Sequence, residues 1–335
     1  MLNSRSDYGL DPGDARVRRI LDALESLTVG KREVSELLVC AMIAGGHVLI
    51  EDIPGIGKTL VAKALAAVTD LKYARVQCTT DLLPSDIVGT SIFHPQDGEF
   101  RFRPGPIFAN LVLVDEINRA SPRSQSALLE AMEERQVTVD GQTHTLEEPF
   151  IVLATENPLD ADDAFPLPTS QLDRFLFRLS IGYPEPEDEV EILRQAPAGS
   201  KPEARGQEPD RVSERVSSLS QPVIDRDGLL ALQAESSRIH VSDRLLHYLA
   251  EVLRATRNDA RVALGASPRA GALWMRAARA RALMRGRSYV IPDDIRELAV
   301  PVLVHRLRAK AGVEPETIID DVLDSVPVPR GEVVR

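Results

Sequence analysis

The stretch Asp52-Ile53-Pro54-Gly55-Ile56-Gly57-Lys58-Thr59 decides the fold, because it is a glycine-rich loop between two segments of different periodicity. Residues 47–51 before it form a short apolar run that predicts a buried strand, and residues 58–68 after it have the apolar spacing of a helix. Glycines let backbone N–H groups curl around phosphates, while the lysine adds a positive charge and the threonine a hydroxyl for Mg²⁺. The stretch therefore predicts a P-loop that binds a nucleoside triphosphate.

One position of the loop departs from the full P-loop pattern, which asks for glycine where this chain has Asp52. This position borders the strand and lies away from the closest phosphate contact, so the prediction of a nucleotide site stands. We expect Lys58 to reach the β- and γ-phosphates and Thr59 to bind Mg²⁺. The residues expected to hold the nucleotide are Pro54, Gly55, Ile56, Gly57, Lys58, Thr59 and Leu60.

Two further apolar segments end in polar residues of the kind that ATP hydrolysis needs. Residues 111–114 lead into Asp115 and Glu116, and residues 150–155 lead to Asn157. Adjacent carboxylates at a strand end are usually just solvated, but a preceding P-loop reverses that interpretation. Asp115 would hold Mg²⁺ through water and Glu116 would polarise the attacking water, since successive side chains on a strand point in different directions. Asn157 would meet the γ-phosphate or the water.

The order of the predicted elements indicates two domains. Strands alternate with helices at first, which predicts a parallel sheet with helices on both faces, and Asp140-Gly141 predicts a β-hairpin over residues 136–146. A stretch rich in Pro, Gly, Ser and charge predicts a linker over residues 196–222. We expect an α/β nucleotide-binding domain over residues 1–195 and a small all-helical domain over residues 223–335. Its predicted helices span residues 229–237, 242–257, 268–284 and 292–307.

The composition is that of a globular protein, with 335 residues of which 43% are hydrophobic and 27% charged. A net charge of −11 argues against a surface built mainly for nucleic acids, because such affinity rests on neutralising phosphates. The start of the chain lacks the apolar core of a signal peptide, and the longest nearly apolar run, residues 37–50, is too short to span a bilayer. We expect a cytoplasmic protein without membrane insertion.

These elements, in this order, resemble the AAA+ ATPases, and the finer pattern closely resembles the MoxR family. In the first part of the chain the resemblance rests on GHVLIEDIPGIGKT (46–59), DLLPSDIVGT (81–90), FRPGPIF (102–108), DEINRA (115–120), QSALLEAM (125–132), ATENP (154–158) and QLDRF (171–175). In the helical part it rests on ATR (255–257), GASPRA (265–270) and HR (305–306). The resemblance as a whole covers nearly all of the chain, about residues 29–307.

The resemblance implies a parallel five-stranded sheet of order 5-1-4-3-2, a helical lid, and a hexameric ring that binds ATP and Mg²⁺ at subunit interfaces. It implies that Asn157 is sensor 1, that Arg174 is an arginine finger reaching the neighbour's ATP, and that Arg269 is sensor 2, reporting the nucleotide state to the lid. Val29-Gly30 would lie at the adenine side, and Arg119 would face the adjoining site.

The resemblance also implies a function. A MoxR-type ATPase would act as a chaperone that couples hydrolysis to the remodelling or maturation of partner proteins, often alongside a separate protein with a von Willebrand factor A domain. An insertion over residues 86–110 within a helix and the hairpin of residues 136–146 would project toward a pore or a partner. Phe100 and Phe102 are candidates for gripping a client.

Two other functions stay open at this stage. A nucleic-acid motor is the first, and its basic run would be Arg276, Arg279, Arg281, Arg285 and Arg287. The net charge favours a solvated helix face for that run instead. A switch that binds nucleotide without hydrolysing it is the second, and the intact Glu116 speaks against it.

Overall fold

The computed structural model describes residues 13–28, 31–53, 56–96, 98–158, 165–183, 186–194 and 221–329. Four of the predicted nucleotide-binding residues lie outside these ranges, namely Val29, Gly30, Pro54 and Gly55. Nearly all of the predicted linker, residues 196–220, also lies outside them.

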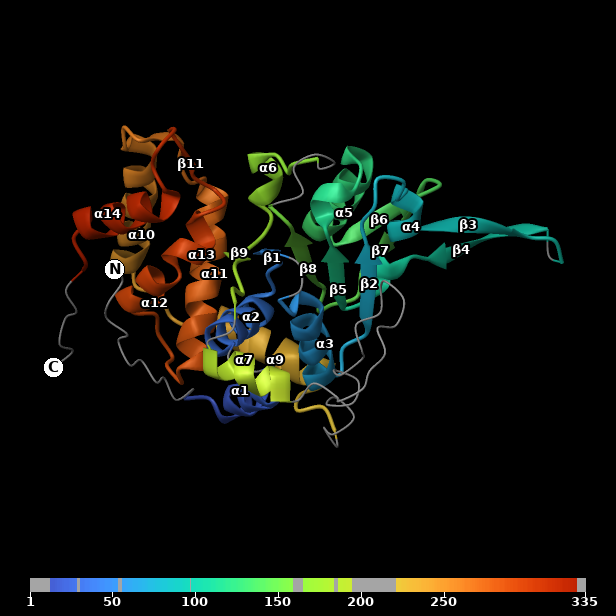
Figure 1. The fold of residues 1–335 in the computed structure, drawn as a ribbon, viewed down its shortest axis with the longest axis horizontal. Coiled ribbons are helices and arrows are strands. Elements are labelled where there is room, and N and C mark those ends of the chain that lie inside the picture. Colours follow the sequence, from blue (N-terminus) through green and yellow to red (C-terminus); the bar gives the residue numbers. More distant parts are fainter. Residues whose placement is uncertain are drawn as a thin grey trace.

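A five-stranded parallel sheet forms the centre of the molecule (Figure 1). Its strands are β1 (Val48–Glu51), β2 (Tyr73–Gln77), β5 (Leu111–Asp115), β8 (Ile151–Glu156) and β9 (Phe177–Leu179). They lie in the order β2-β5-β8-β1-β9, and every neighbouring pair is parallel. When these five strands are counted along the chain the order is 5-1-4-3-2, so the predicted topology is confirmed.

Alternate residues of the strands pack on opposite faces of the sheet. On β5, Leu111 and Leu113 belong to one core and Val112 and Val114 to the other. The helices on the first face are α1 (Ala15–Leu27), α2 (Arg32–Ala44), α3 (Lys58–Thr69) and α9 (Arg226–Ser237), and α5 (Pro122–Glu134) covers the second. Because both faces are covered, the central strands are apolar up to the polar residues at their carboxyl ends.

Two helices begin at the carboxyl edge of the sheet. Gly57 is the N-cap of α3 and has a φ of +90°, a left-handed conformation that glycine adopts without steric cost. Within the described chain no side chain caps this helix start, and the first N–H groups of a helix have no partner among its own carbonyls. The helix α5 begins as predicted, with Pro122 in first position and the Ser121 hydroxyl accepting from the backbone N–H of Ser124.

A helical lid lies beside the sheet, at the left of Figure 1. Its helices are α10 (Asp243–Asn258), α11 (Pro268–Met284), α12 (Pro292–Glu297), α13 (Ala299–Leu303) and α14 (Pro315–Ser325). Its core is closed by Trp274, which is fully buried and donates its indole N–H to the carbonyl of Ile295 at 3.0 Å. Along the described ranges, no helix combines the length and apolar character needed to cross a membrane.

The lid differs from the sequence prediction in three ways. The single helix expected over residues 292–307 is two short helices, because Pro301 lacks a backbone N–H and is tolerated only in the first turn of α13. The helix α14 was not predicted. Neither was the small antiparallel pair of β10 (Val262–Leu264) and β11 (Arg308–Ala309), whose strands are too short to give a sequence signal.

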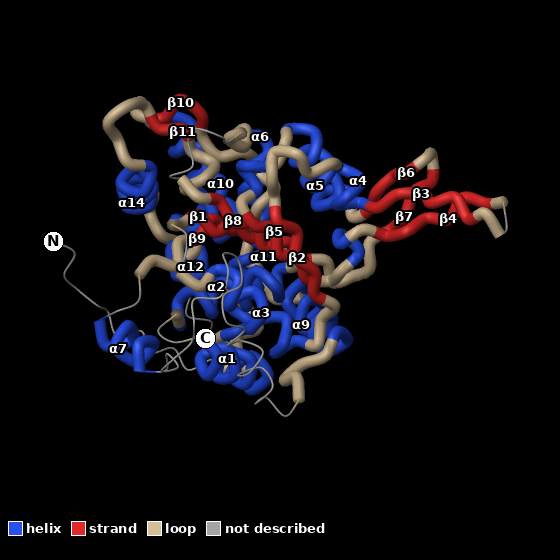
Figure 2. The backbone as a smooth tube through the Cα atoms, turned by 45° about the vertical axis from the view of Figure 1, so that its right-hand side comes forward, coloured by secondary structure: helices blue, strands red, loops and turns tan. Residues whose placement is uncertain are grey.

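Two hairpins project together from the body of the molecule, at the right of Figures 1 and 2. The predicted hairpin over residues 136–146 is confirmed as β6 (Gln136–Val139) and β7 (Gln142–Thr145). The second is formed by β3 (Gly89–His94) and β4 (Glu99–Pro104). Phe102 of β4 stacks on His144 of β7, with ring centroids 3.9 Å apart, so the two hairpins are joined at their bases.

The insertion predicted within a helix is therefore mainly this β3–β4 hairpin, between the short helix α4 (Pro84–Val88) and the 3-10 turn Pro106–Phe108. Its strands were not predicted, because most of their side chains are exposed and leave no alternation of buried and polar positions. Gly89 has a φ of +98°, and a Cβ there would lie 2.3 Å from the carbonyl oxygen of Arg103. The close approach of the two strands at this end thus requires glycine.

Two shorter helices flank β9 in the chain. The helix α6 (Thr169–Leu172) precedes β9, and α7 (Pro186–Arg194) follows it.

His47, just before β1, is buried and neutral. Its Nδ1 accepts the backbone N–H of Val152 at 3.0 Å, so its Nε2 carries the proton and donates to the carbonyl of Met132 at 3.2 Å. Burial, and secondly the charge of Arg135, lower the pKa of His47 to about 3. Burial also lowers the pKa of His305 in the lid.

We expect His47 to make folding sensitive to acid. The unfolded chain protonates this histidine near pH 6.5 and the folded chain only near pH 3, so its contribution is complete above pH 6.5 and is lost as the pH falls. Between pH 7 and pH 5 the free energy of unfolding should fall by about 2 kcal/mol from this residue alone. Urea unfolding at both pH values should show a smaller fall in His47→Gln, and an equal fall would contradict the assignment.

Candidate active site

The P-loop lies at the carboxyl edge of the sheet, directly after β1. Lys58 opens α3, and its Nζ donates to the backbone carbonyls of Asp52 and Glu156, the latter at 3.1 Å. The backbone N–H of Asp52 donates to the same carbonyl of Glu156 at 3.1 Å. These contacts fasten the loop to the ends of β1 and β8 and hold the lysine charge where phosphates would bind.

The carboxylate of Asp52 is bound by the chain that follows β9. Its Oδ2 accepts from the backbone N–H groups of Ile181 and Gly182, both at 2.7 Å, and from the hydroxyl of Ser180 at 3.0 Å. The aspartate at the first P-loop position is thus held by the protein itself and leaves the phosphate site to the other residues of the loop.

Asp115 is buried at the end of β5 and has partners from both neighbouring strands. Its Oδ2 accepts from Arg75 Nε at 2.6 Å, and its Oδ1 accepts from the hydroxyl of Thr155 at 3.3 Å. Thr155 in turn accepts from the backbone N–H of Glu116 at 2.9 Å. Sequence reasoning missed Arg75 and Thr155, because their roles depend on strand neighbours and no local pattern marks them.

Glu116 follows β5 in a left-handed conformation, with a φ of +56°. Its Oε2 accepts from Gln77 Nε2 at 3.1 Å and from Arg119 Nη1 at 3.0 Å. Arg119, expected to face an adjoining site, is therefore paired with Glu116 of its own chain. The carboxylate is held at the sheet edge by groups that could release it to a water molecule.

Asn157 is buried and directly follows β8, the strand that lies between β5 and β1. Its backbone carbonyl accepts from Asn118 Nδ2 at 3.2 Å, which ties the end of β8 to the turn after β5. The neighbouring Glu156 has its pKa raised by burial and by the charge of Glu51. The structure thus brings the described P-loop residues, Asp115, Glu116 and Asn157 to one edge of the sheet.

This edge fits ATP and Mg²⁺ in its chemistry. The uncapped start of α3 offers backbone N–H groups, and Lys58 adds a positive charge beside them. The hydroxyl of Thr59 and the carboxylate of Asp115 are hard oxygen ligands of the kind that Mg²⁺ prefers.

The two predicted arginines belong to the opposite, amino edge of the sheet. Arg174 precedes β9, which runs parallel to β1. The helix α5 ends at the same edge, because Arg135 after it donates to the carbonyls of Gly45 and Phe150, just before β1 and β8. The strands separate the two edges, and β1 with its four residues is about 13 Å long.

Glu133 near the end of α5 joins the two arginines. Its Oε2 lies 2.9 Å from Arg174 Nε, and its Oε1 lies 2.7 Å from Nη1 of Arg269 at the start of α11. Both guanidinium groups therefore lie at the edge of the sheet away from the P-loop of their own chain. Sequence reasoning missed Glu133, because the three residues are far apart in the chain.

The lid also holds the residue before Arg174. Asp173 accepts from Arg306 Nε at 2.7 Å and from the hydroxyl of Ser267 at 2.9 Å. Arg306 is almost fully buried, and burial lowers the pKa of its guanidinium while Asp173 opposes that shift. The residue next to Arg174 is therefore held by two parts of the lid, Ser267 at the start of α11 and Arg306 after α13.

Comparison with known proteins identifies the family of this chain. Residues 47–177 match the model of the ATPase family associated with various cellular activities (AAA), and residues 254–325 match that of the AAA lid domain. Chaperone MoxR1 of Mycobacterium tuberculosis is 38% identical, over 94% of this chain and 82% of that protein. The chain is a member of the MoxR family of AAA ATPases.

Two further proteins are similar to this chain over nearly its whole length. The uncharacterised protein YeaC of Bacillus subtilis is 43% identical, over 93% of this chain and 94% of its own length. A crystal structure of a candidate ATPase from Cytophaga hutchinsonii superposes with a TM-score of 0.81 at 33% identity, covering 94% of this chain and 95% of that one. The predicted family and fold, an AAA+ core with a helical lid, are therefore confirmed.

A substitution of Glu116 tests its assignment as the residue that activates water. We expect Glu116→Gln to bind ATP with unchanged affinity but to turn over about 10²–10⁴-fold more slowly, because the amide cannot accept a proton. Steady-state ATPase rates and calorimetric titration with ATP give the two quantities. Glu130→Gln, exposed on α5, is the matched control and should behave as the parent chain. Unchanged turnover in Glu116→Gln would remove Glu116 from the mechanism.

Proposed function

We propose that this MoxR protein hydrolyses ATP in a hexameric ring of identical subunits and couples hydrolysis to the remodelling or maturation of partner proteins in the cytoplasm. One observation carries the proposal. The groups suited to hydrolysis lie at the carboxyl edge of the sheet, whereas the two candidate arginines lie at the amino edge and are joined through Glu133. A complete site then requires the edges of two different subunits.

The proposed chemistry divides the work among the residues at the carboxyl edge. Lys58 and the start of α3 bind the β- and γ-phosphates, and Asn157 positions the γ-phosphate or the attacking water. Thr59 and Asp115 hold Mg²⁺, which when bound offsets the charge on the phosphate oxygens. Glu116 takes the proton of the attacking water as it adds to the γ-phosphorus opposite the leaving oxygen.

The arginines complete the site of the next subunit. Arg174 supplies the finger that offsets charge at the transferring phosphate, an effect worth about 10³–10⁵ in rate in other phosphoryl-transfer enzymes. Arg269, which shares Glu133 with Arg174, acts at the same neighbouring site and links it to the lid through α11. Each arginine would leave Glu133 for the phosphates when the neighbour carries ATP.

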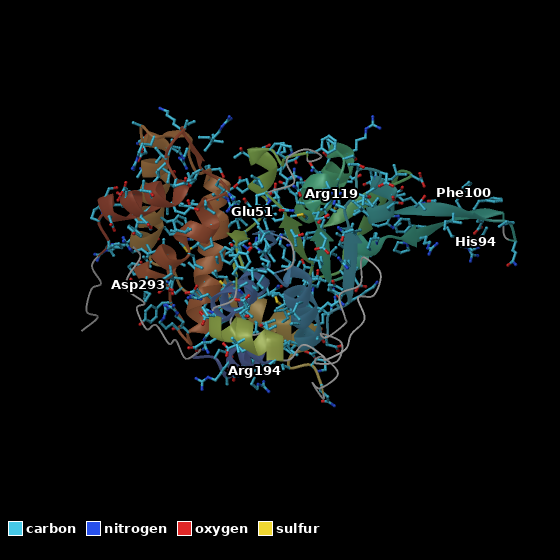
Figure 3. All side chains as sticks on the ribbon, viewed as in Figure 1. Glu51, His94, Phe100, Arg119, Arg194 and Asp293 are labelled. Atoms are coloured by element: carbon cyan, nitrogen blue, oxygen red, sulfur yellow. The ribbon has the colours of Figure 1, made fainter. Side chains whose placement is uncertain are left out.

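The proposed partner is a protein client, and the projecting β3–β4 hairpin supports this class. Phe93 and Phe100 face each other across its strands with ring centroids 5.3 Å apart, and their side chains are exposed by 50% and 73%. Figure 3 shows Phe100 and His94 on this projecting hairpin, away from Glu51 at the centre of the molecule. Of the two predicted gripping residues, Phe102 instead packs on His144 at the base. A separate von Willebrand factor A protein remains part of the proposal.

The basic run on and after α11 favours a protein partner over a nucleic acid. Most of its arginines bind groups of the chain itself: Arg276 the carbonyls of Ala44 and Gly45, Arg281 Glu36 and Glu297, Arg285 Glu297, and Arg287 Asp294. Guanidinium groups with such partners contribute little to binding phosphates of DNA or RNA.

A client trap tests the proposed function. We expect the Glu116→Gln chain, with ATP present, to retain a defined client protein on affinity purification from cells. Phe93→Ser with Phe100→Ser in the same trap should lose that client while binding ATP normally, because both side chains are exposed and distant from the P-loop. Recovery of nucleic acid in place of a protein would contradict the proposed partner class.

A further inference from the structure

The binding of Asp52 by residues 180–182 has a geometry that the proposed hydrolysis does not use. The aspartate is the first residue of the P-loop, and one of its oxygens accepts three hydrogen bonds from this segment. Its other oxygen accepts from the backbone N–H of Ile53 at 3.0 Å. Hydrogen bonds to an ionised carboxylate are stronger than those between neutral groups, so this contact holds the segment firmly.

Lys31 binds the same segment from the opposite direction. Its Nζ donates to the carbonyl of Ile181 at 3.0 Å and to that of Gly182 at 2.9 Å. The two residues therefore give their N–H groups to a carboxylate and their C=O groups to an ammonium. Gly182 has a φ of +66°, a left-handed conformation that favours glycine at this turn. We call Lys31, Asp52 and residues 180–182 the clamp.

The clamp ties the sheet together beyond its last ladder pair. The edge strand β9 has three residues, and its pairing with β1 ends at Ile50 and Leu179. Arg178 of β9 also pairs with Glu51 of β1. Asp52 extends this connection past the strand ends, into the segment that precedes α7.

The strand order shows which part of ATP would meet the clamp. The groups assigned to the γ-phosphate, Asp115, Glu116 and Asn157, lie on β5 and β8, both on one side of β1. A nucleotide with its triphosphate at the P-loop after β1 must extend its nucleoside the other way, across the end of β9. The turn of residues 180–182 stands at that end.

We propose that Asp52 is a positioning residue that holds the turn of residues 180–182 as the nucleoside side of the ATP site, with Lys31 as its counterpart. The inference rests on the proposed function, because it assigns a wall of the same site. A P-loop with glycine at this position would still cradle a triphosphate. It would lack the contact that fixes the wall for ribose and base.

The test compares ATP with inorganic tripolyphosphate, which carries the phosphates and no nucleoside. Both are titrated calorimetrically, with Mg²⁺, into the full-length Glu116→Gln chain. Asp52→Gly should weaken ATP binding about 10–100-fold, because the released turn no longer holds the nucleoside, and tripolyphosphate binding by less than about 3-fold. Asp52→Asn, which keeps an acceptor oxygen in place, should recover part of the ATP affinity.

Variants at the other members of the clamp keep the test valid if Asp52→Gly folds poorly. Lys31→Met and Ser180→Ala should each weaken ATP and spare tripolyphosphate, and Lys31→Met should add little to Asp52→Gly because the two act on one turn. Glu33→Gln, exposed on α2, is the matched control and should change neither ligand.

The outcomes separate the two proposals. Equal weakening of ATP and tripolyphosphate binding in Asp52→Gly would mean that Asp52 only shapes the phosphate loop. Unchanged binding of both ligands would mean that the clamp does not contribute to nucleotide affinity. Either result overturns the role given to Asp52 and leaves the proposed ATPase intact. Failure of the parent Glu116→Gln chain to bind ATP would overturn the proposed function together with this inference.

Discussion

Parallel strands bring all their carboxyl ends to one edge of the sheet, and the rest of this structure depends on that constraint. The P-loop after β1, the carboxylates after β5 and Asn157 after β8 meet there because the three strands are neighbours. The chain returns to the amino edge through helices, so Arg174 before β9 and Glu133 near the end of α5 meet at the opposite edge. One subunit thus presents the groups proposed to bind ATP at one edge and two arginines at the other, the arrangement that the proposed head-to-tail ring would use.

Polar contacts fix the chain on both sides of β9, and those on the amino side come from the lid. At the amino edge, Ser267 and Arg306 hold Asp173, the residue next to the candidate finger. At the carboxyl edge, Asp52 holds the turn after β9, from which the chain continues toward the lid. A change in the lid would therefore act, through Asp173, on the candidate finger Arg174. These contacts would give the proposed ring a physical route between nucleotide state and movement of the lid.

Local patterns were enough to predict the strands and the groups at their carboxyl ends, whereas the strand order was implied by the family resemblance. Residues 111–115 are an apolar strand ending in a carboxylate, and Gly57-Lys58-Thr59 follows another, so their positions follow from neighbours in sequence. Glu133 with Arg269 could not be predicted, because their contact joins α5 to the lid and depends on packing. The strands of the β3–β4 hairpin were not predicted for a different reason. Most of their side chains, such as Phe100, are exposed, so the sequence shows no alternation of buried and exposed positions. The role of Asp52 also required the structure, because its partners follow it by about 130 residues.

Mixing two inactive chains tests most directly whether a complete site needs two subunits. Glu116→Gln lacks the proposed base and keeps the finger, whereas Arg174→Ala lacks the finger and keeps the base. Each chain alone should hydrolyse ATP very slowly. In mixed rings some interfaces pair an intact Glu116 with an intact Arg174, so the account predicts ATPase activity well above the sum of the separate chains. Activity equal to that sum, although mixed rings form, would contradict it.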